Sequence, residues 1–261
     1  MSMLNPGVKR KEVFGWAMYD FANSGYTTVV ITAVFAAYFV GGVANKAEWA
    51  TLAWTSALSL SYAIVMLTIP AMGEWADRHA AKKKLLMAVT AACVVSTAAL
   101  AWVGPGQVAL AVLLIVISNT FYSYGESLTA SFLPELAKPE AMGRISAWGW
   151  AWGYLGGMLT LGICLAYVLW AQGQGQTAGQ FVPITMLMTA GIYALSAGVT
   201  FVLMKEHAKP QLTRQTHNGY WRQLLMTFKS VIPATSTLMC CKIFPSHWPS
   251  RSVVHKSKSR I

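Results

Sequence analysis

Long apolar runs, separated by short polar or charged stretches, make up most of residues 13–204. Each run reaches about twenty residues, the length that an α-helix needs to cross the roughly 30 Å hydrocarbon core of a bilayer. The pattern therefore predicts an all-α polytopic membrane protein with a six-helix transmembrane bundle. The predicted spans are about 13–40, 52–76, 85–103, 108–130, 145–170 and 181–204.

The composition supports a membrane protein and argues against a soluble one. Hydrophobic residues make up 55% of the chain and charged residues only 11%, whereas soluble domains carry about 25% charged residues. The mean hydropathy is +0.46. The first apolar run is too long for the core of a signal peptide and contains no small-residue cleavage site, so we interpret it as a retained helix.

The charges in the connections assign a direction to each span. Residues 1–12 and 73–84 and the stretch after 205 are basic, and residues 133–144 are charged, while the connections between them are nearly neutral. Basic connections stay on the cytoplasmic side, so the N-terminus and residue 205 are both predicted to be cytoplasmic, in a bacterial inner or plasma membrane.

The net charge of +11 is concentrated near the C-terminus. Residues 1–204 contain ten Lys or Arg and eight Asp or Glu, whereas residues 205–261 contain ten Lys or Arg and a single acid, Glu206. This distribution predicts contact with anionic lipid headgroups of the bilayer and no nucleic-acid partner.

The first predicted helix contains a carboxylate at membrane depth. Asp20 lies about 10 Å along the helix from Val13, and Asn23 and Ser24 share its face. An unpaired carboxylate there costs about 2.5–3.5 kcal/mol on insertion scales, so this face should point into the bundle or a water-filled cavity. Asp20 is either a carboxylate that contacts solute or protons, or a structural acid capped by a neighbouring basic side chain.

The fourth predicted helix carries a polar stripe. Asn119, Tyr122 and Glu126 follow an i, i+3, i+7 pattern, which places them on one side of a helix. Such a stripe is typical of a cavity lining, and it is also compatible with hydrogen bonds that only hold helices together. The substrate or proton path is predicted to include Asp20, Asn23, Asn119, Tyr122 and Glu126.

Two further motifs concern helix ends and helix packing. A charged hinge from Gly73 to Lys84 separates the second and third apolar runs and contains Asp77, Arg78, Lys82 and Lys83. On the fifth predicted helix, small residues at Gly149, Gly153, Gly156 and Gly157 predict close approach of a neighbouring helix. Trp148, Trp150 and Trp152, in the same helix, are predicted to face lipid or the membrane interface.

Catalytic and metal-binding patterns do not emerge from the sequence. The four Cys lack metal-ligand spacing with His, and all five His lie in predicted connections or the tail. We therefore predict no metal site, no cofactor and no enzymatic activity.

The hinge Gly73-x-x-x-Asp77-Arg78-x-x-x-Lys82-Lys83-Lys84 resembles the signature loop of the major facilitator superfamily, and the glycines at 149–157 resemble its glycine-rich motif. Residues 16–26, 132–136 and 143–157 are similar to the vacuole-effluxer branch, which is related to an autophagy-linked amino-acid exporter of yeast. The resemblance covers about residues 10–230.

The resemblance implies two six-helix bundles that give alternating access to a central site. It also implies that Asp77 and Arg78 form a cytoplasmic charge relay that gates the transporter, with Gly73, Lys82, Lys83 and Arg144 in the same motif. Only the first bundle and the start of the central cytoplasmic loop, 205–230, are expected here. Residues 231–261 are expected to be an aberrant, disordered tail left by a frameshift or early termination, with a regulatory tail as the alternative.

The sequence thus predicts a secondary active transporter of a small polar solute such as an amino acid, truncated to its first half. Its partners are the lipid bilayer, the solute, protons, and either a second copy of the chain or the missing C-terminal bundle. The alternative is an incomplete fragment that does not transport. A lone bundle is expected not to transport as a monomer.

Overall fold

The computed structural model describes residues 3–206, which all fall within one compact unit of the chain. The described residues are helical, without a β-strand, and six helical spans are long and apolar enough to cross a membrane. The predicted fold class, an all-α six-helix bundle, is confirmed. The predicted loop 205–230, apart from its first two residues, and the predicted tail 231–261 lie outside the described residues.

The first span runs from Arg10 to Val43 and changes its helical form three times. It consists of α1 (Arg10–Tyr26), the π-helical segment η1 (Thr27–Ala33), α2 (Val34–Tyr38) and a second π-helical segment, η2 (Phe39–Val43). The apolar pattern predicted one uninterrupted helix over 13–40. π-Helical turns are rare and occur often at functional sites, and η1 begins beside the cavity described below.

The other five spans are simpler. They are α3 (Ala50–His79), α4 (Lys82–Ala99) with the 3₁₀ turn η3 (Leu100–Trp102), α5 (Val108–Ala130), α7 (Met142–Gly173) and α8 (Ala178–Leu203). Between α5 and α7 the chain forms the short helix α6 (Leu133–Leu136) and the turn η4 (Pro139–Ala141).

The expectation of a charged loop from Gly73 to Lys84 is wrong for most of that stretch. Helix α3 continues through the charged residues to His79, and α4 already begins at Lys82. Glu74 and Arg78 form an i, i+4 ion pair, which supports the helix beyond the apolar run. The turn itself is only Ala80 and Ala81, and Ala80 ends α3 in a left-handed conformation with φ 44°.

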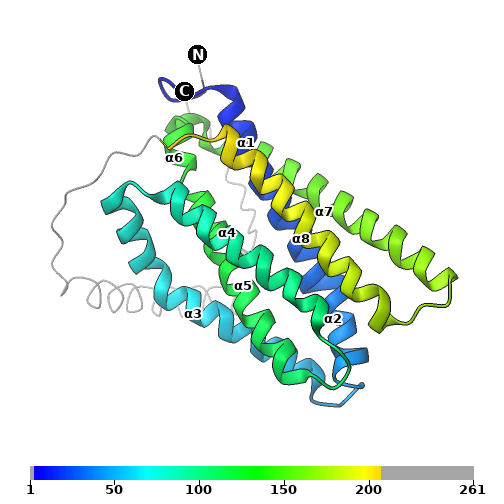
Figure 1. The fold of residues 1–261 in the computed structure, drawn as a ribbon. Helices are drawn as coiled ribbons and strands as arrows, with labels where there is room; N and C mark the ends of the chain where they lie inside the picture. Colours follow the sequence, from blue (N-terminus) through cyan, green and yellow to red (C-terminus); the bar gives the residue numbers. More distant parts are fainter. Residues whose placement is uncertain (1–2, 207–261) are drawn as a thin grey trace, which may run out of the picture. The chain divides into compact units, whose positions relative to one another are not determined.

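The first span lies at the centre of the bundle. Helix α1 packs against α5, α7 and α8, while α5 packs against α3 and α4. Figure 1 shows the consequence, with α3 and α7 on opposite sides of the bundle and the other spans between them. Five of the largest fully buried side chains among the described residues belong to the first span: Glu12, Tyr19, Tyr26, Phe35 and Phe39.

The two ends of the bundle differ in charge. At one end, Asn5 donates its backbone N–H to the Leu136 carbonyl at 3.1 Å, and Glu206, just after α8, reaches the start of α4. At the other end, Gly106 donates to the Val43 carbonyl at 2.9 Å. Among residues 3–206, every Lys and Arg except Lys46 lies near the first of these ends, which we call the basic end.

Candidate functional site

Buried hydrogen bonds hold one face of α1 against its neighbours. Tyr19 Oη lies 2.8 Å from Thr90 Oγ1 of α4, and Tyr26 Oη lies 2.8 Å from Ser118 Oγ of α5. Tyr193 of α8 donates to Asn23 Oδ1 at 2.7 Å. Because these bonds lie inside the bundle, they fix the rotation of α1 and direct its opposite face towards α7.

The opposite face of α1 packs closely against glycines of α7. A β-carbon at Gly153 would collide with the carboxylate of Asp20, and one at Gly156 would collide with the backbone of Phe21. Gly149 similarly makes room for the Trp16 ring, and Gly157 lies against Ser24 and Thr28. The four glycines predicted to allow close helix packing thus lie where α7 meets α1.

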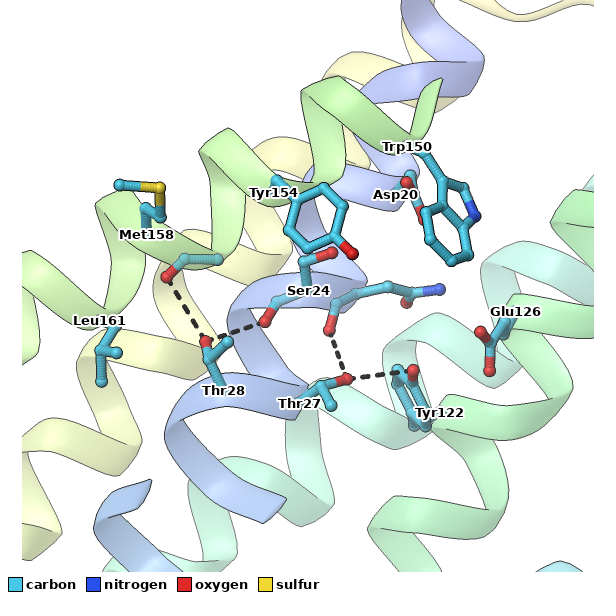
Figure 2. A pocket seen from close by; sticks show the side chains of 12 residues that line it. Asp20, Ser24, Thr27, Thr28, Tyr122, Glu126, Trp150, Tyr154, Met158 and Leu161 are labelled. Carbon is cyan, nitrogen blue, oxygen red and sulfur yellow. Dashed lines mark hydrogen bonds between the residues drawn. The ribbon is translucent and has the colours of Figure 1, made fainter. Parts of the chain in front are cut away.

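A cavity of about 350 Å³ opens between α1, α5 and α7 (Figure 2). Its polar wall comes from α1, η1 and α5, and its aromatic and aliphatic wall comes from α7. The lining residues are Asp20, Asn23, Ser24, Thr27, Thr28, Tyr122, Glu126, Trp150, Tyr154, Gly157, Met158 and Leu161.

The two threonines at the start of η1 form hydrogen bonds to other residues that line the cavity, marked by dashed lines in Figure 2. Thr27 Oγ1 donates to Tyr122 Oη at 3.0 Å, and Thr28 Oγ1 donates to the Ser24 carbonyl at 2.9 Å. Tyr122 also stacks on Tyr26 with ring centroids 4.9 Å apart. The hydroxyl groups are therefore positioned by the helices before any solute is present.

Two carboxylates reach this cavity from different helices (Figure 2). Within residues 3–206, neither Asp20 nor Glu126 takes part in an ion pair, and Glu126 lies within hydrogen-bonding reach of the Tyr122 hydroxyl group. None of the twelve lining residues is Lys, Arg or His. The cavity therefore presents two negative groups that no cationic side chain of the described bundle neutralises.

The structure brings four of the five predicted path residues together in this cavity: Asp20, Asn23, Tyr122 and Glu126. Asn119 lies elsewhere. It is fully buried and donates from Nδ2 to Ser61 Oγ of α3 at 2.6 Å. Helix α3 covers α5 at the level of Asn119, whereas Glu126, further along α5, is exposed.

The environment of the aromatic residues of α7 differs in part from the lipid or interfacial contact predicted from the sequence. Trp150 and Tyr154 line the cavity and are 65% and 64% exposed. Trp150 therefore borders the cavity, whereas the sequence predicted only contact with lipid or the membrane interface. Trp152 instead packs inward and donates from Nε1 to Met18 Sδ at 3.1 Å. Alternating tryptophans point to different sides of a helix, and the apolar pattern gives no sign of which side meets a cavity.

A second polar cluster lies at the basic end, around Lys82. Its ammonium group pairs with Asp77 of α3 at 3.0 Å and with Glu135 of α6 at 2.9 Å. Its backbone N–H donates to Glu206 Oε1 at 2.7 Å, and Glu206 Oε2 accepts from the backbone N–H of Lys83 at 3.4 Å. We call Asp77, Lys82, Glu135 and Glu206 the ionic cluster.

The sequence did not identify Glu135 or Glu206 as members of this cluster. Glu206 lies at the N-terminus of α4, where free backbone N–H groups favour an anion. Lys83 adds a bond from Nζ to the Met204 carbonyl at 2.7 Å. The cluster therefore joins the ends of α3, α6 and α8 to the beginning of α4.

The remaining residues of the predicted gating motif lie apart from the ionic cluster or only border it. Gly73 borders a small cavity together with Asp77 and Lys82. Arg78 pairs with Glu74 on its own helix, not with Asp77. Arg144 lines a different cavity at the beginning of α7.

Among residues 3–206, no group of three His, Cys, Asp or Glu side chains could hold a metal ion. What the fold and the cavity define is a multi-pass membrane protein with an acidic, partly aromatic cavity opening between three of its helices.

The family follows from comparison with known proteins. The model of the family described as "Vacuole effluxer Atg22 like" matches residues 37–243, and the chain belongs to this family. The match begins inside the first span and ends within the segment 231–261. The similar block at residues 16–26 precedes it.

A curated relative is the uncharacterized MFS-type transporter YxiO of Bacillus subtilis (strain 168). It is 32% identical over 169 residues, which cover 63% of this chain and 39% of the relative. The chain thus matches about two-fifths of that relative's length. No solved structure matches the chain.

Proposed function

We propose that this chain forms one bundle of a secondary transporter that moves a small polar solute, such as an amino acid, by alternating access. Membership in the vacuole-effluxer family and similarity to an MFS-type transporter support transport. The cavity supports a small solute, since about 350 Å³ lies at the lower end of the range for ligand pockets.

The observation that carries this proposal is the pair of carboxylates in the cavity without a cationic partner. A carboxylate in a membrane span is costly, and such groups usually mark a path for protons or solutes. Asp20 and Glu126 line the same cavity although they are far apart in the sequence. A structural acid would instead be expected to bind a basic side chain, as Asp77 and Glu135 do at Lys82.

The lining suggests a role for each group. Asp20 and Glu126 accept a proton or bind the ammonium group of an amino acid. Thr27 and Tyr122 offer hydroxyl groups to the polar part of the solute. The ring faces of Trp150 and Tyr154 are suited to contact either its aliphatic part or its cation.

The ionic cluster is proposed to close the basic end of the bundle in one state of the transport cycle. Its ion pairs join three helix ends, so opening this end requires at least one of them to break. We further propose that the basic end is cytoplasmic, because positive loops are retained on that side. The groups opposite the cavity come from a second bundle or from a second copy of the chain.

Counterflow in proteoliposomes tests this function. The 261-residue chain is reconstituted into vesicles preloaded with unlabelled amino acids, and entry of each radiolabelled amino acid is measured. We expect labelled solute to accumulate with the unmodified chain, through association of two copies in the vesicle membrane, and to stop accumulating with Asp20→Asn. Glu48→Gln is the matched control, because Glu48 is exposed in the connection at the opposite end of the bundle.

If Asp20→Asn transports as well as the unmodified chain, the proposed role of Asp20 is wrong. If no amino acid accumulates with the unmodified chain in vesicles shown to contain folded protein, the alternative of a chain that does not transport by itself is favoured.

A further inference from the structure

A second cavity, separate from the acidic one, lies at the basic end between α1 and α7. Its volume is about 680 Å³. Beside two residues of the N-terminal segment, it is lined by Arg10, Val13, Phe14, Arg144, Ile145 and Trp148. It therefore combines two guanidinium groups with an apolar and aromatic wall.

The guanidinium groups of the two arginines are not neutralised by acidic side chains of the described bundle. Neither takes part in an ion pair within residues 3–206, and no acidic residue lines the cavity. Glu140, four residues before Arg144, forms no ion pair there either, while Glu12 is buried and accepts the backbone N–H of Lys9. Two guanidinium groups around one cavity without a carboxylate form a site suited to an anion.

An apolar stripe leads from this cavity along α7. Trp148, Leu155, Leu159 and Ile163 are spaced seven, four and four residues apart and are 42–48% exposed. This spacing puts them on one side of the helix. The stripe is about 22 Å long at 1.5 Å per residue, longer than the roughly 15 Å of hydrocarbon in one leaflet.

The aromatic residues connect the cavity to the stripe. The ring centroids of Phe14 and Trp148 are 6.4 Å apart, and those of Trp148 and Trp152 are 6.1 Å apart. Tryptophan is enriched at the level of lipid headgroups, because its ring is apolar and its N–H is polar. The site thus offers cations, an interfacial aromatic wall and an apolar track, in the order in which a phospholipid has its phosphate, glycerol and acyl chains.

We propose that this cavity binds an anionic phospholipid, with the phosphate between Arg10 and Arg144 and an acyl chain along the exposed stripe of α7. Basic pockets at the membrane surface bind acidic headgroups in this way. The proposal is independent of transport, since none of these residues lines the acidic cavity.

Native mass spectrometry of the purified 261-residue chain tests the proposal. The chain is titrated in detergent with dioleoyl phosphatidylglycerol and, separately, with dioleoyl phosphatidylcholine, which has no net charge. We expect tighter binding of the anionic lipid, and a loss of about tenfold or more in its affinity in the double variant Arg10→Gln/Arg144→Gln. A tenfold loss corresponds to about 1.4 kcal/mol, and the double variant removes two charge-assisted contacts to the phosphate.

Two control variants make the result specific. Lys11→Gln/Lys84→Gln removes the same charge from exposed residues at the same end, and should leave lipid affinity unchanged. Arg10→Lys/Arg144→Lys keeps the charge but loses the planar fork, and should bind with intermediate affinity.

Three results would overturn the proposal. The first is equal affinity for the two lipids in the unmodified chain. The second is an equal loss of affinity in the Lys11→Gln/Lys84→Gln control. The third is binding of glycerol phosphate as tight as that of phosphatidylglycerol, which would show a site for free phosphate compounds with no contribution from the acyl chains.

Discussion

The acidic cavity and the ionic cluster contain the same kinds of side chain in opposite arrangements. In the ionic cluster, Asp77, Glu135 and Glu206 each have a partner, either the Lys82 ammonium group or the N-terminal N–H groups of α4. In the cavity, Asp20 and Glu126 have no cationic partner within the described bundle, and Glu126 has only the Tyr122 hydroxyl group beside it. The bundle thus places a positive group beside its carboxylates where they hold helix ends together, and places no cation beside those at the site proposed for solute.

This contrast separates two uses of charge in one membrane protein. Charged residues near the basic end can be hydrated or paired, and their pairing stabilises one arrangement of helices. Unpaired carboxylates deeper in a span raise the energy of the unoccupied state, and this cost is recovered when a proton or cationic group arrives. Variants of the two regions should therefore change different properties.

The largest effect on stability is expected where Asp20 lies against α7. Gly153→Val would place a branched side chain where the Asp20 carboxylate and Ser24 now lie. We expect a loss of about 3 kcal/mol in the free energy of unfolding, measured by circular dichroism in detergent. Gly162→Val on the same helix is the control, because a β-carbon there has open space around it. Equal losses in both variants would contradict the close α1–α7 contact.

A smaller loss is expected in the ionic cluster. Lys82→Met leaves the half-buried carboxylates of Asp77 and Glu135 without their shared cation. We expect the free energy of unfolding to fall by about 2 kcal/mol, with Lys84→Met as the control at an exposed neighbouring residue. If both variants are as stable as the unmodified chain, the cluster does not hold the helix ends together.

The smallest loss is expected at the start of α4. Glu206→Gln keeps the size of the side chain but removes the negative charge that faces the backbone N–H groups of Lys82 and Lys83. The free energy of unfolding should decrease by about 1 kcal/mol, and the decrease should be smaller at high salt. Glu140→Gln, an exposed acid at the same end, should cause no change. A similar decrease in both variants would indicate a general charge effect.

Much of the fold could be predicted, because membrane spans leave a strong apolar pattern in the sequence. The π-helical segments could not be predicted, since Thr27–Ala33 contains only Thr, Val, Ile and Ala, and none of these residue types is specific to a π-helix. The end of α3 was also missed, because a helix can continue through charged residues once it leaves the hydrocarbon.

The sequence predicted the polar face of each helix separately, but not how these faces combine into one site. The depth of Asp20 and the stripe ending at Glu126 each indicated a polar face, but only the folded bundle brings the two carboxylates to one cavity. Asn119 belongs to the same stripe but is covered by α3, and a helical repeat does not reveal which part of a stripe a neighbouring helix covers. Glu206 was missed because its partners are backbone N–H groups, which no side-chain pattern identifies.

The central claim is that the cavity is open to water and is made negative by Asp20 and Glu126. It is tested by the reactivity of Ser24→Cys, a cavity-lining residue, in a chain whose four native cysteines are replaced by alanine. A cationic and an anionic methanethiosulfonate reagent are compared, with the fully buried Ala17→Cys as the unreactive control.

We predict that Ser24→Cys reacts faster with the cationic reagent and that this preference disappears when Asp20→Asn and Glu126→Gln are added. If Ser24→Cys is as unreactive as Ala17→Cys, or if its preference is unchanged without the two carboxylates, the account of the cavity is contradicted.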